Sequence, residues 1–99
     1  MLHIINKSPL EKSALESCLS VATEGSTLLL IEDAVYAATR GNAFEARLQA
    51  AQGRFKICVL TPDLEARGLT EEDLLVDVTV LSRSEMGTLM EEQDVVLSF

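Results

Sequence analysis

Aromatic residues are scarce in this 99-residue chain: they make up 4% of it, with no Trp, one Tyr and three Phe. Hydrophobic residues nevertheless reach 47%, so the core has to be built from Leu, Val, Ile and Ala. A domain this small buries only part of its apolar surface when it folds alone. We therefore expect a partner to cover some of the aliphatic surface.

Histidine and cysteine are also rare. The single histidine is His3, and the two cysteines are Cys18 and Cys58, neither of them in a C-x-x-C pair. The usual zinc site of four His and Cys ligands therefore lacks its donors. Nucleotide-binding glycine motifs are missing too, and with them the backbone cradle for phosphate groups. The sequence predicts no metal, no cofactor and, in a reducing compartment, no structural disulfide.

Positive charge and long apolar runs are the other two shortages. The chain has 8 Lys+Arg against 16 Asp+Glu, a net charge of −8, which repels phosphate backbones and argues against direct nucleic-acid binding. No uninterrupted apolar run, that of residues 28–31 included, approaches the roughly 20 residues that span a membrane. The first residues do not resemble a signal peptide. We expect a cytoplasmic protein with no membrane contact.

What is present is a regular alternation of apolar strands and amphipathic helices. The expected strands are residues 2–5, 27–31, 55–60, 76–81 and 95–99, and the expected helices are residues 8–23, 33–40, 42–52, 61–68 and 82–93. Alternation at this spacing predicts parallel strands joined by right-handed crossovers. The chain therefore reads as an α/β protein, a single three-layer α/β/α domain over residues 1–99 with a mainly parallel five-stranded sheet. The last strand has an alternative, pairing with another chain.

Helix start signals support this division. Ser8 and Glu11 form a capping box around Pro9, and Ser82 and Glu85 form a second one. Asp33 is expected to cap the helix that follows the second strand.

Ligands of a parallel sheet bind beyond the carboxyl ends of its strands. We call the residues there the strand-end rim: Asn6, Lys7, Ser8, Glu32, Asp33, Thr61, Asp63 and Ser82. The rim has no Cys and no His. The adjacent carboxylates of Glu32 and Asp33 could serve as an acid and a base. Alternatively, Asp33 caps a helix while Glu32 faces solvent or a partner.

Cys18 is the better candidate of the two cysteines for a reactive thiol. At 100° per residue, it lies near the middle of the apolar stripe of its helix. A free cysteine there behaves as a small hydrophobic residue, and burial raises its pKa. No Lys or Arg lies within one turn of it. Cys58, inside the apolar strand 55–60, is expected to be buried and inert.

Two acidic clusters lie near helix ends, residues 71–73 and Glu91, Glu92 and Asp94. Their simplest interpretation is solvated helix termini, where the helix dipole favours carboxylates in a first turn. A docking role toward a basic partner stays open.

Several short segments form a distinctive combination when taken in chain order. They are Met1-Leu2-His3, Asn6-Lys7-Ser8-Pro9, Glu24-Gly25, Leu28-Leu29-Leu30, Glu32-Asp33, Tyr36-Ala37-Ala38, and residues 60–68, which read L-T-P-D-L-E-A-R-G. The combination resembles the DsrH/TusB family over nearly the whole chain, less so after about Asp77.

The resemblance implies the same three-layer α/β/α fold and the smallest of three homologous subunits of a cytoplasmic sulfurtransferase complex. It implies DsrE/TusD-like and DsrF/TusC-like partners in a dimer of heterotrimers, and a downstream DsrC/TusE-like carrier protein that receives persulfide sulfur. The sulfur ends in tRNA 2-thiouridine in one branch and enters dissimilatory sulfur oxidation in the other.

The principal sulfur-accepting cysteine of such complexes belongs to the DsrE/TusD-type subunit. This chain is therefore expected to have a mainly structural duty and not to be the main catalytic subunit. DsrH-type members carry a cysteine in a segment that resembles residues 15–19, so Cys18 tilts the assignment toward that type and is a possible persulfide site. Two alternatives remain: an independent persulfide carrier using Cys18, and a small-anion-binding domain using Lys7, Ser8 and Thr61.

Overall fold

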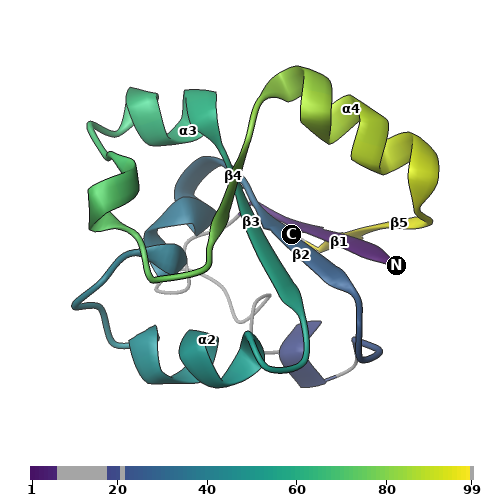
Figure 1. Cartoon of the computed structure of the whole chain (residues 1–99), viewed down its shortest axis with the longest axis horizontal. Helices are drawn as coiled ribbons and strands as arrows, with labels where there is room; N and C mark the ends of the chain where they lie inside the picture. The colour runs from purple at the N-terminus through teal and green to yellow at the C-terminus, as the bar shows by residue number, and fades with distance from the viewer. Residues whose placement is uncertain (7–17, 21, 99) are drawn as a thin grey trace.

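A computed structural model of the chain describes residues 1–6, 18–20 and 22–98. Five short strands form one sheet in the order β4-β3-β2-β1-β5, and every neighbouring pair is parallel (Figure 1). The strands are β1 Leu2–Ile5, β2 Thr27–Leu30, β3 Lys56–Leu60, β4 Thr79–Leu81 and β5 Val95–Ser98. The predicted parallel α/β fold is confirmed.

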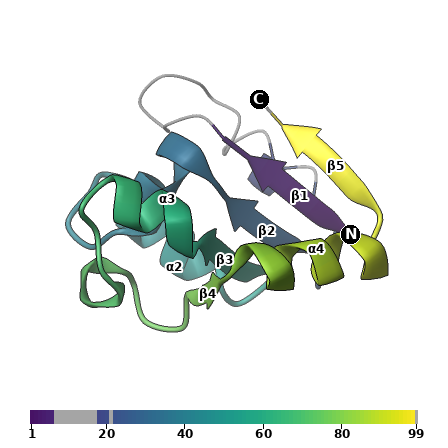
Figure 2. The same ribbon diagram turned by 90° about the horizontal axis from the view of Figure 1, so that it is seen from above.

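Helices cover both faces of this sheet (Figures 1 and 2). The helical elements are the 3₁₀ helix η1 Glu32–Ala38, α2 Glu45–Ala51, α3 Thr61–Ala66, the 3₁₀ turn η2 Glu71–Asp73 and α4 Arg83–Glu92. The chain steps along the sheet in one direction from β1 to β4, and α4 then returns across it to β5. Because crossovers are right-handed, a step in the opposite direction puts α4 on the opposite face.

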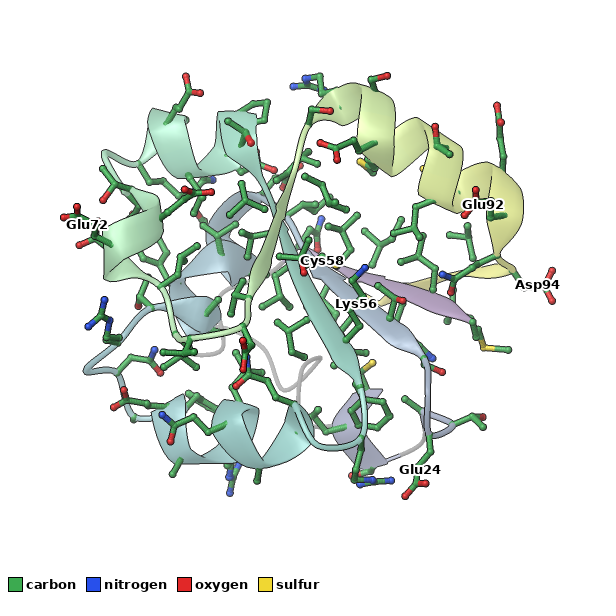
Figure 3. All side chains as sticks on the ribbon, in the orientation of Figure 1. Glu24, Lys56, Cys58, Glu72, Glu92 and Asp94 are labelled. Carbon is green, nitrogen blue, oxygen red and sulfur yellow. The ribbon has the colours of Figure 1, made fainter. Side chains whose placement is uncertain are left out.

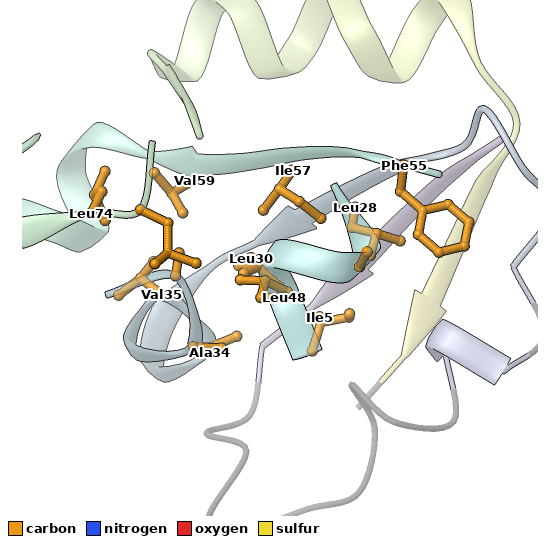
Figure 4. Close-up of a cluster of buried hydrophobic side chains, with 14 of the residues drawn as sticks. Ile5, Leu28, Leu30, Ala34, Val35, Leu48, Phe55, Ile57, Val59 and Leu74 are labelled. Carbon is orange, nitrogen blue, oxygen red and sulfur yellow. The ribbon is translucent and has the colours of Figure 1, made fainter. Parts of the chain in front are cut away.

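The two faces bury two separate apolar clusters. The larger cluster lies under η1 and α2 and includes the strand residues Ile5, Leu28 and Val59 (Figure 4). The smaller cluster lies under α4, whose Met86 and Leu89 pack against it. Alternation along the buried strands sends successive side chains to opposite clusters, and this accounts for their uninterrupted apolar sequence.

Most element boundaries agree with the sequence-based expectation. Ser82 and Glu85 make both hydrogen bonds of the predicted capping box, at 3.1 Å from the Glu85 N–H to Ser82 Oγ and at 2.9 Å from the Ser82 N–H to Glu85 Oε1. The predicted helix at residues 8–23 falls mostly outside the described residues, although residues 18–20 are helical. The last strand pairs with β1 of the same chain. No helix in the described part of the chain is long and apolar enough to cross a membrane.

Three expectations were wrong in detail. The segment expected to be a helix over residues 33–40 is a 3₁₀ helix that begins at Glu32, and Asp33 does not cap it. Glu32 itself has a φ of 50°, in the left-handed region, where the chain turns away from β2. The fourth strand spans only Thr79–Leu81, because the turn η2 and the loop after it take up the residues before it.

Candidate functional site

Cys18 is buried in the larger cluster. Its side chain is only 2% exposed, and it packs in the same cluster as Ala22 and strand residues such as Ile5. This confirms the position that helical spacing predicted for it, on the core side of its helix. The thiol is therefore enclosed by the apolar side chains of this cluster.

Burial has a direct chemical effect on this thiol. It raises the pKa of Cys18 from an ordinary 9.0 to about 11, because an apolar environment disfavours the thiolate. At pH 7 such a thiol is ionised in roughly one molecule in 10⁴. Since the thiolate is the nucleophile, Cys18 in this conformation is a poor acceptor of sulfur.

A shallow hollow lies at the surface beside the turn that carries Cys18. It measures about 460 Å³ and is lined by Leu19, Ser20, Arg47 and Arg54. The guanidinium of Arg54 lies 4.9 Å from the ring centroid of Phe55 and 3.6 Å from Glu24 Oε1. No sequence pattern predicts this approach, since α2 and the turn after it are distant from Cys18 along the chain. The guanidinium groups of Arg47 and Arg54 thus lie beside Leu19 and Ser20, and they do not contribute to the pKa shift of Cys18, whose cause is burial.

Cys58 lies on the other face of the sheet, under α4 (Figure 3). It lines a groove of about 260 Å³ between the β3–β4 edge and α4, together with Lys56, Glu85 and Glu92. The side chain is fully buried. Burial raises the pKa of Cys58, and the Lys56 ammonium acts in the opposite direction. The thiol is thus held protonated, as expected for an inert core cysteine.

Arg67, which the sequence did not single out as a site residue, contacts two residues of the strand-end rim. Its Nε donates to Asp33 Oδ1 at 3.0 Å, and its Nη2 forms an ion pair with the same oxygen at 2.9 Å. Its Nη1 donates to the carbonyl of Asp63 at 3.0 Å. The side chain of Arg67 is only 19% exposed. Asp33 is therefore engaged in an ion pair between η1 and α3, while Glu32 is exposed. This arrangement does not present Glu32 and Asp33 as a free acid–base pair.

Thr61 and Ser82 of the rim have local roles at the starts of helices. Thr61 is the first residue of α3, and Ser82 is occupied as the cap of α4. Lys7 and Ser8, which the anion-binding alternative needs, lie outside the described residues. Within the part of the chain that the structure describes, no three His, Cys, Asp or Glu side chains gather closely enough to hold a metal ion.

Two buried polar atoms on β1 and just beyond it lack a hydrogen-bond partner. They are Nε2 of His3 and Oδ1 of Asn6. Burial and the nearby positive N-terminus lower the pKa of His3, so the imidazole is neutral near pH 7. His3 pairs in register with Leu28, which places it on the face of the larger cluster. Its role there is that of a buried neutral side chain.

The comparisons with known proteins agree on one family. The family model described as DsrH like protein matches residues 7–96. Protein TusB of Pectobacterium parmentieri is 40% identical over 72 residues, which cover 73% of each chain. Protein TusB of Escherichia coli K12 is 37% identical over 83 residues, covering 80% of this chain and 84% of that one.

Solved structures carry the same fold. The ychN protein of E. coli superposes with a TM-score of 0.80 at 23% identity, over 99% of this chain and 97% of that one. Protein MTH1491 of Methanobacterium thermoautotrophicum superposes with a TM-score of 0.77 at 17% identity, over 97% and 95% of the two chains. The family model and the TusB relatives together decide the assignment, since both span most of the sequence. This chain belongs to the DsrH/TusB family.

Proposed function

We propose that the chain is a subunit of a cytoplasmic sulfur-relay complex, a single DsrH/TusB-like unit over residues 1–99. Its partners are homologous DsrE/TusD-like and DsrF/TusC-like subunits in a dimer of heterotrimers. A DsrC/TusE-like carrier protein receives the sulfur. The observation that carries this proposal is the family match across residues 7–96.

The relay step sets a clear requirement on any cysteine that takes part. An acceptor thiolate attacks the outer sulfur of a donor persulfide, the donor S–S bond breaks, and the donor leaves as a thiolate while a new persulfide forms on the acceptor. The exchange needs no external oxidant or reductant. The acceptor must therefore be reachable and ionised, and both cysteines of this chain are buried with raised pKa values.

These properties favour a mainly structural duty for the chain. The principal acceptor cysteine then belongs to a partner subunit, and Cys18 is at most an accessory persulfide position. The Arg67–Asp33 ion pair supports this division of labour, because it engages the Asp33 carboxylate in a contact between η1 and the end of α3.

Transfer of sulfur toward tRNA 2-thiouridine is the route we favour, since the relatives reported above are TusB proteins. Dissimilatory sulfur oxidation is the alternative. Deleting the gene and measuring 2-thiouridine in bulk tRNA separates the two. Loss of the modified nucleoside supports the tRNA route, and an unchanged level with impaired sulfur oxidation supports the other.

Co-expression tests membership of the complex. The chain is produced together with the two homologous small subunits from the same genome, with an affinity tag on only one of those subunits. We expect all three chains to elute together in gel filtration at a mass well above that of any one of them. A tagged preparation that contains the other two subunits but never this chain would refute the proposal.

A further inference from the structure

Strand β5 is an edge of the sheet. In the part of the chain that the structure describes, it has a strand neighbour, β1, on one side only. Its residues 95–98 include no charged residue and no proline. Proteins usually protect such an edge with a charge, a proline or a very short strand, because its free backbone groups can pair with another chain. The opposite edge strand, β4, has only three residues.

The backbone of β5 has a defined outward side. The N–H of Leu2 donates to the carbonyl of Asp94 at 2.8 Å, and Leu2 pairs in register with Val95. In a parallel ladder, successive residues turn their N–H and C=O groups alternately toward the neighbour and away from it. Val95 and Leu97 therefore direct their backbone groups outward, where an added strand would bond to them.

Exposed apolar side chains gather at the start of this edge. The N-terminus lies beside the end of α4 and the beginning of β5 (Figure 2). Three of the exposed large hydrophobic residues come from these segments: Met1 at 52%, Met90 at 40% and Val95 at 37%. We call these three side chains, which lie on the neighbouring segments at the start of this edge, the apolar patch.

The charged side chains of α4 and β5 beside the patch are all acidic except Arg83 at the far end of α4, and the α-ammonium of Met1 is a positive group beside them. Residues 84–99 contain four carboxylates, Glu85, Glu91, Glu92 and Asp94, and no Lys or Arg. Glu91, Glu92 and Asp94 are exposed, and Figure 3 shows Glu92 and Asp94 projecting at this end of the molecule. A basic segment is attracted to such a surface, whereas a second copy of this chain would add another −8 charges.

From these observations we infer that the outer edge of β5, with the patch of Met1, Met90 and Val95, docks an extended, Lys- or Arg-bearing segment of a partner subunit as an added strand. The inference rests on the proposed function for the existence of a partner and adds where the contact lies. Main-chain bonds to Val95 and Leu97 supply affinity, the patch buries apolar side chains, and the carboxylates select a basic sequence.

Charge substitutions at one position test the inference. Val95→Lys and Val95→Glu both place a charge in the patch, but only Lys repels a basic segment. Leu97→Pro removes an outward donor without removing a bond to β1. Val76→Lys is the control, because Val76 is 77% exposed and lies in the loop that leads to β4.

The probe is the pair of homologous DsrE/TusD-like and DsrF/TusC-like subunits, and the readout is their affinity for each variant. We expect Val95→Lys and Leu97→Pro to weaken binding about tenfold or more, Val95→Glu to have a smaller effect, and Val76→Lys to have none. Amide hydrogen exchange on the wild-type complex gives a variant-free check: exchange at Val95 and Leu97 should slow relative to the free chain.

The outcomes are distinguishable. If the wild-type chain assembles but Val95→Lys and Leu97→Pro bind like Val76→Lys and the two amides stay unprotected, the docking inference falls and the proposed function stands. If Val95→Glu weakens binding as much as Val95→Lys, the basic character of the partner segment is wrong. A homodimer of the chain alone that Val95→Lys dissociates would make a second copy the occupant. A wild-type chain that never assembles overturns both proposals.

Discussion

Arg67 and Asp33 meet at one carboxylate oxygen, Oδ1, which accepts a hydrogen bond of 3.0 Å from Nε and forms an ion pair with Nη2 at 2.9 Å. The pair links α3, which follows β3, to η1, which follows β2. Both residues belong to the segments that resemble the DsrH/TusB family, the Glu32-Asp33 pair and residues 60–68. The structure therefore gives a physical reason for their presence: they brace the open end of the sheet.

Loss of this brace should destabilise the chain. We expect Arg67→Ala to lower the free energy of unfolding by about 1–2 kcal/mol, since the pair is charged and hydrogen-bonded but Asp33 is half exposed. Arg67→Lys should recover only part of the loss because it lacks the planar fork. Urea denaturation measures both. Arg83→Ala, at an exposed arginine in the first turn of α4, is the matched control. Equal stability of the two alanine variants would contradict the bracing role.

Native Cys18 should resist alkylation. The Cys58→Ala variant leaves Cys18 as the only thiol, so that intact mass reports on it alone. We expect iodoacetamide at pH 7.5 to modify the folded variant at least about 100-fold more slowly than the same variant in urea, because the thiol is buried and protonated. Rapid labelling of the folded chain would favour the independent persulfide carrier instead.

Alkaline pH should weaken the fold through the same thiol. The unfolded chain releases the Cys18 proton near pH 9, whereas the folded chain holds it to about 11. Between those values the unfolded state binds fewer protons, so the free energy of unfolding falls as pH rises, by at most about 2–3 kcal/mol. Below pH 9 this contribution is fully present. Denaturant titrations from pH 8 to 11 should show a shallower decline for Cys18→Ala than for the wild type, and parallel curves would contradict the assignment.

The capping box of α4 should contribute measurably to the free energy of unfolding. Ser82→Ala removes the oxygen that accepts the Glu85 N–H, and we expect a loss of about 1 kcal/mol in the free energy of unfolding. Ser84→Ala, two residues further and inside the helix, is the control and should be neutral or slightly stabilising.

Protonation of Glu85 at acid pH should weaken the same capping box. Hydrogen bonds from Ser82 lower the pKa of the Glu85 carboxyl, so its contribution is present above the unfolded pKa and is lost as pH falls through the lower folded pKa. Glu85→Gln should flatten the acid limb of the stability curve. An acid limb identical to that of the wild type would show that the carboxylate does not contribute.

Local signals were enough to predict much of this protein. The apolar runs and capping residues identified the five strands and the start of α4, because strand burial and helix capping depend on neighbours in the sequence. Helical periodicity alone placed Cys18 in the core. The family resemblance also came from short segments, before any contact between them was known.

Contacts between distant residues were decided only by the tertiary structure. Asp33 was expected to cap a helix, but Arg67, 34 positions along the chain, approaches it once β2 and β3 lie side by side. The approach of Arg47 and Arg54 to Leu19 likewise depends on the fold. So does the position of β5 at the edge of the sheet. Sequence patterns indicate which residues are buried and which residues cap a helix. Which partners they meet depends on how the sheet is ordered, and that order is fixed by packing of the whole chain.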